Sequence, residues 1–289
     1  MSQVKTALKI DAKLGECPRW DEQTQTLFWV DIDNFRLNQF DPKTGTNKVL
    51  QLDEEIGCFA LREKGGFVAG LRSGYVTIDS LEGGITPIAD PEADKDWQRF
   101  NDGRCDAAGR FIAGTLNPRK DAYSGHFYSL DQGTVKKLVG ENWTSNGLAF
   151  SPDSKTLYYS DTPQHKIFAC DYDLDTGTVG ESRIFAEFPL GWGRPDGASV
   201  DADGNYWSAL YGGGRVVQLN PQGEIINTIA VPAKNPTMVA FGGSDLKTLY
   251  ITTTKAGSEE EAEQYPLSGS IFAVEVEVAG AVEPRYKGE

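Results

Sequence analysis

Six short segments of this 289-residue chain share one local pattern, and four of them carry, at the same place, a side chain that can bind a metal or a substrate. The segments are GECPRWD, IGCFALR, FNDGRCD, SNGLAFS, PDGASVD and PTMVAFG. Each is aligned on its last apolar residue before a charged or turn residue. The slot four places earlier then holds Glu16, Gly57, Asn101, Asn146, Asp196 and Thr237. Two carboxylates and two amides at equivalent positions indicate one shared polar site.

Such a set of side chains is suited to binding a hard divalent cation. Carboxylate and amide oxygens bind Ca²⁺, Mg²⁺ or Mn²⁺ well, and Zn²⁺ less readily. The competing interpretation is structural, because Asn and Asp before Gly are ordinary turn formers. That interpretation is weaker where the slot recurs in register, and it does not account for Glu16.

Short β-strands must position these slots, since helical periodicity is nearly absent from the sequence. The run TLFWVDI at 26–32 returns in similar form, at a spacing of about 40 to 48 residues, the period of four-stranded propeller blades. The copies lie at 65–71, 109–115, 156–162, 204–210 and 248–254. We therefore predict an all-β fold, a six-bladed β-propeller of four-stranded antiparallel blades, in a single domain spanning 1–289. A two-sheet sandwich, the alternative, does not explain a six-fold period.

The slot-bearing strand comes first in each repeat and is predicted to be innermost, so that the slot side chains line the central channel. The glycine at the Gly57 slot is expected to leave room for a ligand. Closure of the ring requires the chain ends to pair. We expect residues 4–10 to complete the last blade, because this β-type run precedes the first repeat and the last repeat lacks a clear fourth strand. The acidic run at 257–264 is expected to be an exposed loop of that blade.

Composition excludes several classes of partner. A net charge of −14 argues against nucleic acid, since phosphate binding needs a basic surface. The sequence shows no secretory signal and no apolar run long enough to span a bilayer, so a cytoplasmic protein without membrane association is expected. The four cysteines, Cys17, Cys58, Cys105 and Cys170, form no CxxC pair and are expected to be buried free thiols. Two histidines make a His-rich zinc site improbable.

Several motifs in order resemble the SMP-30/gluconolactonase/LRE-like family: GECPRWD with TLFWVDI, RFNDGRCDAAGRFIAGT, SNGLAFSPDSKTLYYSDT and RPDGASVDADGNYWSALYGGGRV. The resemblance covers nearly the whole chain. It implies a six-bladed propeller with one divalent cation in the channel, whether Ca²⁺, Zn²⁺, Mn²⁺, Mg²⁺ or Fe²⁺. It further implies that Glu16, Asn146 and Asp196 are metal ligands, that Asn101 binds substrate and water, and that Arg99 anchors the substrate.

The chain departs from the family pattern after the AGT segment. Where some members carry an acidic substrate contact, this sequence has Asn117 and Arg119, so the sugar preference of those members does not transfer. Three aromatic residues on expected mouth loops, Tyr123, Trp192 and Tyr211, are candidates for stacking on a sugar ring, although packing is the commoner role.

The function implied is hydrolysis of a sugar lactone, such as a glucono-, xylono- or arabinonolactone, to the aldonic acid by a metal-dependent lactonase. The metal would polarise the lactone carbonyl, and Asp196 is the candidate general base. Two alternatives remain open: a non-catalytic calcium-binding regulatory protein, and a metal-dependent esterase or phosphotriesterase on the same scaffold. Arg99 beside Asn101 favours the enzyme, because a pure cation site gains nothing from an arginine. The protein is expected to be a monomer or a weak homo-oligomer.

Overall fold

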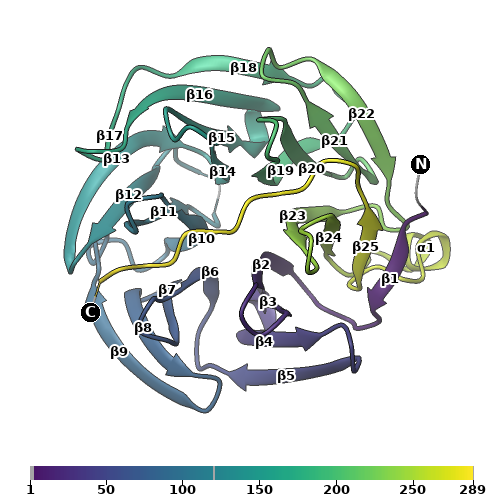
Figure 1. The fold of residues 1–289 in the computed structure, drawn as a ribbon, viewed down its shortest axis with the longest axis horizontal. Helices are drawn as coiled ribbons and strands as arrows, with labels where there is room; N and C mark the ends of the chain where they lie inside the picture. Colours follow the sequence, from purple (N-terminus) through teal and green to yellow (C-terminus); the bar gives the residue numbers. More distant parts are fainter. Residues whose placement is uncertain (1–2, 120, 289) are drawn as a thin grey trace.

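The structure, a computed structural model, describes residues 3–119 and 121–288. Its strands form six antiparallel sheets arranged around a central axis (Figure 1). This confirms the predicted six-bladed propeller.

Blades 1 to 3 each contain four strands in chain order from the axis outward. Blade 1 consists of β2 (Gly15–Asp21), β3 (Thr26–Asp31), β4 (Arg36–Asp41) and β5 (Thr46–Gln51). Blade 2 consists of β6 (Ile56–Leu61), β7 (Phe67–Leu71), β8 (Gly74–Ser80) and β9 (Gly83–Ala89). Blade 3 consists of β10 (Arg99–Cys105), β11 (Phe111–Leu116), β12 (Gly125–Asp131) and β13 (Thr134–Asn142).

Blades 4 to 6 repeat this plan with two variations. Blade 4 consists of β14 (Ser145–Phe150), β15 (Thr156–Asp161), β16 (Lys166–Asp173), β17 (Thr178–Val179) and β18 (Arg183–Glu187). Its outer position is divided, because both β17 and β18 pair with β16. Blade 5 consists of β19 (Arg194–Val200), β20 (Tyr206–Tyr211), β21 (Arg215–Leu219) and β22 (Ile225–Ala230). Blade 6 consists of β23 (Pro236–Gly242), β24 (Thr248–Thr253), β25 (Ile271–Glu275) and β1 (Lys5–Leu8).

The pairing of β1 with β25 closes the ring, as predicted for residues 4–10. Lys5 lies opposite Ala273 and Leu8 opposite Ile271. In Figure 1 the N-terminal strand lies at the outer edge of blade 6, beside β25. The first and last parts of the chain therefore share one sheet, and β25 is not left as an open edge.

Burial follows the position of a strand within its blade. The second strands are buried on both faces, whereas the outer strand β5 alternates between exposed and half-buried residues. Each blade packs against a neighbouring blade on both of its faces, so strands near the axis must be apolar on both sides. This explains the continuous apolar runs from which the repeat was recognised. The four cysteines are buried free thiols, as expected.

Two short helical elements and one α-helix interrupt the strand pattern. The 3₁₀ helices η1 (Ile32–Asn34) and η2 (Thr162–Gln164) follow the second strands of blades 1 and 4. The acidic run predicted to be a loop does lie between β24 and β25, but it contains α1 (Glu259–Gln264). Ser258 accepts a hydrogen bond from the Glu261 N–H at this helix start, and three glutamates in the first turn face the positive end of the helix dipole.

The segment after β25, residues 276–288, forms a strap across one face of the ring, which the sequence did not reveal. In Figure 1 it runs in yellow from β25 over the centre to the side of blade 2. Gly280 bridges Asp201 in blade 5, and the Tyr286 N–H donates to Leu61 O in blade 2 at 2.8 Å. These partners follow the ends of innermost strands, whereas the slots lie near the strand starts. The strap therefore covers the face opposite the slots.

None of the helices in the described ranges is long and apolar enough to cross a membrane.

Candidate metal and substrate site

Every slot residue lies at an irregularity in the pairing of its innermost strand with the second strand. The register shifts fall at Glu16/Arg19, Ile56/Cys58, Phe100/Gly103, Asn146/Ala149, Pro195/Ala198 and Pro236/Met238. Bulges release a side chain from the regular alternation of the sheet and occur frequently beside functional sites. The residue after the slot shows the strain directly, since Cys17 and Gly147 have φ of 47° and 61°.

Asn101 and Asn146 lie in direct contact. The Asn101 Nδ2 donates to Asn146 Oδ1 at 2.6 Å and to Ser145 O at 3.1 Å. The Asn146 Nδ2 donates to Thr162 Oγ1 at 2.8 Å, so the two hydrogen bonds together fix which side of each amide faces the channel. The Asn146 Oδ1 accepts the one bond from Asn101 among the described residues and keeps a second lone pair for another partner.

Glu16 and Asp196 are buried carboxylates, 9% and 6% exposed, from blades 1 and 5. Burial raises the pKa of Glu16 well above its ordinary value, and the negative charges of Asp196 and Asp102 raise it further. Burial likewise raises the pKa of Asp196, with Asp102 adding to the effect while Arg194 and Arg99 oppose it. Within the described ranges neither carboxylate forms an ion pair. Two buried, unpaired carboxylates are costly unless a cation compensates them.

The chemistry of this donor set fits a hard divalent cation. Glu16, Asp196 and the Asn146 oxygen offer two charges and one neutral oxygen, and the Glu16 carboxylate accepts only a long bond, 3.3 Å, from the Cys17 N–H. The described residues contain no group of three or more His, Cys, Asp or Glu side chains arranged around a common point. The proposed site has only two such side chains, Glu16 and Asp196, and takes its third protein oxygen from an amide.

The two remaining slots play structural roles. The sequence suggested that Gly57 leaves room for a ligand, and this is wrong: a Cβ there would lie 2.0 Å from the Phe100 carbonyl oxygen, so the space belongs to the neighbouring blade. Thr237 is fully buried, donates to Gly15 O at 2.5 Å and contacts Thr252 Oγ1 at 2.8 Å. The bond to Gly15 joins blades 6 and 1, and the contact with Thr252 lies within blade 6.

Arg99 begins β10 at the mouth of the channel. Its Nη1 donates to Phe100 O and to Asn101 Oδ1, both at 2.9 Å. Burial lowers the pKa of the guanidinium, and the nearby charges of Asp33 and Glu55 oppose this effect. Arg99 also lines a cavity of about 300 Å³ between blades 2 and 3, large enough for part of a small ligand.

The residues in place of the family's acidic contact organise their own loop. Asn117 is 1% exposed, its Nδ2 donates to Asp121 Oδ1 at 2.7 Å, and its Oδ1 accepts from the Arg119 N–H at 2.9 Å. The guanidinium of Arg119 lies over the Trp97 ring, 5.0 Å from its centroid. Asn117 is thus engaged within the loop and does not replace the acidic contact.

The three predicted aromatic residues at the mouth all have partners. Tyr123 packs edge-on against Trp143 at 5.3 Å between ring centroids. Arginine side chains cover the other two: Arg194 lies over Tyr211 and Arg215 over Trp192, at 5.2 and 5.3 Å. Sequence reasoning missed Arg194, although it precedes Asp196 by two residues, as Arg99 precedes Asn101.

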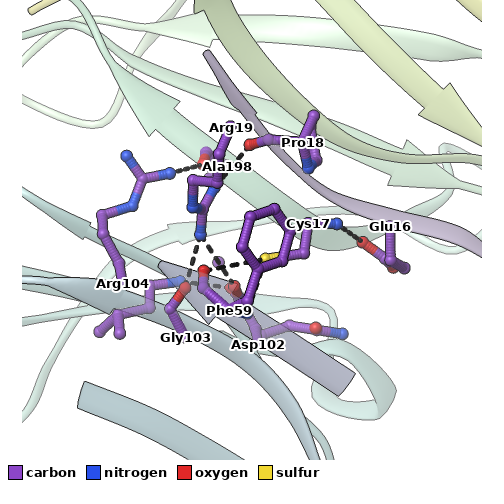
Figure 2. A network of polar contacts seen from close by, with 12 residues as sticks. Glu16, Cys17, Pro18, Arg19, Phe59, Asp102, Gly103, Arg104 and Ala198 are labelled. Atoms are coloured by element: carbon purple, nitrogen blue, oxygen red, sulfur yellow. Dashed lines mark hydrogen bonds and ion pairs between the residues drawn. The ribbon is translucent and has the colours of Figure 1, made fainter. Parts of the chain in front are cut away.

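A buried ion network below the slots was also missed (Figure 2). Arg19 donates to Gly103 O at 2.5 Å and lies 4.0 Å from Asp102, which accepts the Leu148 N–H at 2.9 Å. The strap residue Glu283 pairs with the Arg19 Nε at 3.2 Å and with the Arg104 Nη1 at 2.6 Å. The sequence offered only isolated charges inside apolar strands, with no sign that they meet.

The protein is a propeller of six blades around a channel, with a polar site on its axis. Carboxylates and amides on the innermost strands form this site, and arginines lie at one mouth of the channel. The model of the SMP-30/Gluconolactonase/LRE-like family matches residues 14–255, and the chain belongs to this family.

Individual relatives match over almost their whole length. A 6-deoxy-6-sulfogluconolactonase from Pseudomonas putida is 44% identical over 288 residues, 99% of each chain. Human regucalcin (Homo sapiens) is 32% identical over 280 residues, 94% of each chain. A solved structure of a calcium-binding protein, regucalcin, from Agrobacterium tumefaciens has a TM-score of 0.95 at 28% identity, covering 99% of this chain and 98% of that one.

Proposed function

We propose that this protein is a metal-dependent lactonase that hydrolyses a sugar lactone to the aldonic acid. The observation that carries the proposal is the convergence, in one channel, of two buried carboxylates, Glu16 and Asp196, with the polar pair Arg99 and Asn101. Among the described residues neither carboxylate forms an ion pair. The carboxylates suit a divalent cation, and the Arg99 guanidinium beside them, bound only through its Nη1 among the described residues, has spare donors for a substrate.

Each residue then has a distinct task. Glu16, Asn146 and Asp196 hold the cation, which when bound polarises the lactone carbonyl and lowers the pKa of water. Asp196 takes the proton from the attacking water and returns it to the leaving ring oxygen. Arg99 orients the substrate through its remaining N–H donors. Asn101 accepts a substrate or water O–H at its Oδ1, because both of its N–H donors are bound to Ser145 and Asn146.

The substrate class draws on the relatives. The Pseudomonas putida protein is named for a sulfonated gluconolactone, which supports a six-carbon aldonolactone as the core of the substrate. The calcium-binding regucalcin from Agrobacterium tumefaciens supports a divalent metal, and we propose Ca²⁺, Zn²⁺, Mn²⁺, Mg²⁺ or Fe²⁺ as the ions to compare.

A rate panel tests the proposal. Protein stripped of metal is assayed with glucono-, xylono- and arabinonolactone, an aryl ester and a phosphotriester, before and after each cation is restored. Lactone hydrolysis that needs the cation supports the proposal. Faster turnover of the aryl ester or phosphotriester would assign an esterase instead. Calcium binding without turnover of any substrate would assign a regulatory protein.

A further inference from the structure

A second ring of residues lies above the slots, two positions earlier in each blade. It consists of Leu14, Glu55, Arg99, Thr144, Arg194 and Asn235. Each is the first residue of its innermost strand or the residue just before it. The innermost strands begin at the mouth that carries the slots, so the residues of this ring lie nearer to that mouth than the slots do.

Most charges near this ring are neutralised. Glu55 accepts hydrogen bonds from the Arg72 Nη2 and Nε at 2.5 and 2.7 Å. At blade 6, Glu261 accepts from the Asn235 Nδ2 at 2.8 Å and pairs with Lys234 at 3.3 Å. These two glutamates are thus already engaged by partners of their own.

Arg99 and Arg194 differ from the rest of this ring, since among the described residues neither forms an ion pair. Their charges nevertheless reach the site, because both guanidinium groups lower the pKa of Asp196. They stand on blades 3 and 5, on either side of the blade that carries Asn146. In a chain of net charge −14, two arginines without carboxylate partners beside the proposed metal site require an explanation.

Arg194 has its donors free. Arg194 in β19 lies opposite Tyr211 in β20, and its guanidinium lies over the Tyr211 ring, 5.2 Å from the ring centroid. This cation–π contact positions the guanidinium. No described residue accepts a hydrogen bond from it. A guanidinium is a rigid fork of donors without an acceptor, which matches carboxylate, sulfonate or phosphate groups better than neutral hydroxyls.

We propose that Arg194, together with Arg99, binds a negatively charged substituent on the lactone, so that the preferred substrate is an anionic sugar lactone. This rests on the proposed lactonase function, with the lactone ring at the slots. The chain of the sugar then points toward the mouth, where the second ring meets its charged end. Once a cation compensates Glu16 and Asp196, the two guanidinium groups are available to pair with the charged end of the substrate.

The kinetic test compares glucono-1,5-lactone with the same lactone carrying a sulfonate or phosphate at its sixth carbon, in metal-loaded wild type, R194Q and R215Q. We expect wild type to favour the charged lactones, and R194Q to lower their kcat/KM by about 10- to 100-fold, the effect of charge-assisted hydrogen bonds. For the neutral lactone the change should be below about threefold. R215Q is the matched control, because Arg215 also covers an aromatic ring but begins β21, the third strand of blade 5. Equal losses on charged and neutral lactones would overturn the proposal.

A binding measurement separates this inference from the proposed function. Calorimetry compares gluconate with its 6-sulfonate and 6-phosphate derivatives, and the sulfonate arm excludes direct phosphate binding to the cation. Wild type should bind the derivatives at least about tenfold more tightly than gluconate, and R194Q should lose this difference. Equal affinities in wild type would refute the anion site even where neutral lactones are hydrolysed. Tighter binding of the derivatives without hydrolysis of any lactone would refute the lactonase and retain the anion site.

Discussion

The Asn101 side chain donates to Asn146 at 2.6 Å, and this contact is the centre of a hydrogen-bond chain across three blades. It begins with the Arg99 guanidinium, which donates to Asn101, and continues from Asn146 to the hydroxyl of Thr162. Thr162 in turn donates to Pro195 O at 2.9 Å, the residue before Asp196. The proposed substrate residues and the proposed ligands are therefore oriented by one connected network.

The first prediction concerns Asn146. Asn146→Ala removes an oxygen of the proposed cation site and interrupts the hydrogen-bond chain. We expect weaker cation binding, by at least about tenfold as for the loss of supporting groups around a metal. Titration of metal-stripped protein with Ca²⁺ and Mn²⁺, followed by calorimetry, measures this. Asn38→Ala is the control, because Asn38 is a buried amide in β4 that bonds Asn47 away from the channel. Unchanged affinity in Asn146→Ala would remove this residue from the site.

The second prediction concerns Asp196. Asp196→Asn should lower kcat/KM for the best lactone by about 100- to 10,000-fold, as expected for the loss of a general base. The fold should survive, because the change removes a buried charge at constant size. Circular dichroism and thermal unfolding check the fold. Near-wild-type turnover in this variant would disprove the central assignment.

The third prediction is a pH dependence of metal-free stability. The pKa values of Glu16 and Asp196 are raised in the folded state, so their contribution to stability is fully present below their unfolded pKa values, about 4. It is lost as the pH rises through the raised folded values. Metal-free Asp196→Asn should therefore gain stability relative to wild type as the pH rises, measured by urea unfolding at several pH values. Added cation should reverse the order. A pH-independent difference would contradict the raised pKa values.

The repeat, the closure by residues 4–10 and the innermost position of the slots could be predicted from the sequence. The reason is that every blade has the same local pattern of turns and buried strands. It misjudged Gly57, since the requirement for glycine comes from the Phe100 backbone of the next blade. It also missed the strap, whose contacts with blades 2 and 5 join residues far apart in the chain and leave no periodic trace.

The fourth prediction tests the close approach at Gly57. Gly57→Ala should destabilise the protein by about 1–3 kcal/mol or more, because the added methyl would meet Phe100 O at 2.0 Å and the two innermost strands must separate. Gly257→Ala is the control, since the nearest atom to its added methyl is Glu261 Oε2 at 3.9 Å. Denaturant unfolding measures both free energies. Equal, small effects would show that blades 2 and 3 can move apart freely.

The fifth prediction concerns the strap. Glu283 carries the charge that compensates Arg19 and Arg104, whose side chains are 2% and 8% exposed. Removing one partner of a buried ion pair leaves an uncompensated charge and costs about 3–5 kcal/mol. We expect Glu283→Ala to lose stability of that order in denaturant unfolding. Asp171→Ala is the control, because it breaks a 2.9 Å pair with Arg183 that is largely exposed and worth about 1 kcal/mol or less.

The strap also bears on the site, because Arg19 links Glu283 to Asp102, whose charge raises the pKa of both Glu16 and Asp196. Glu283→Gln keeps the size of the side chain and removes its charge, which separates electrostatics from packing. If the strap serves stability alone, this variant should lose stability while its cation affinity stays within about twofold of wild type. The reason is that Glu283 lies on the face opposite the slots and the effect of its charge falls with distance. A large change in cation affinity would instead show that the ion network beneath the channel tunes the site above it.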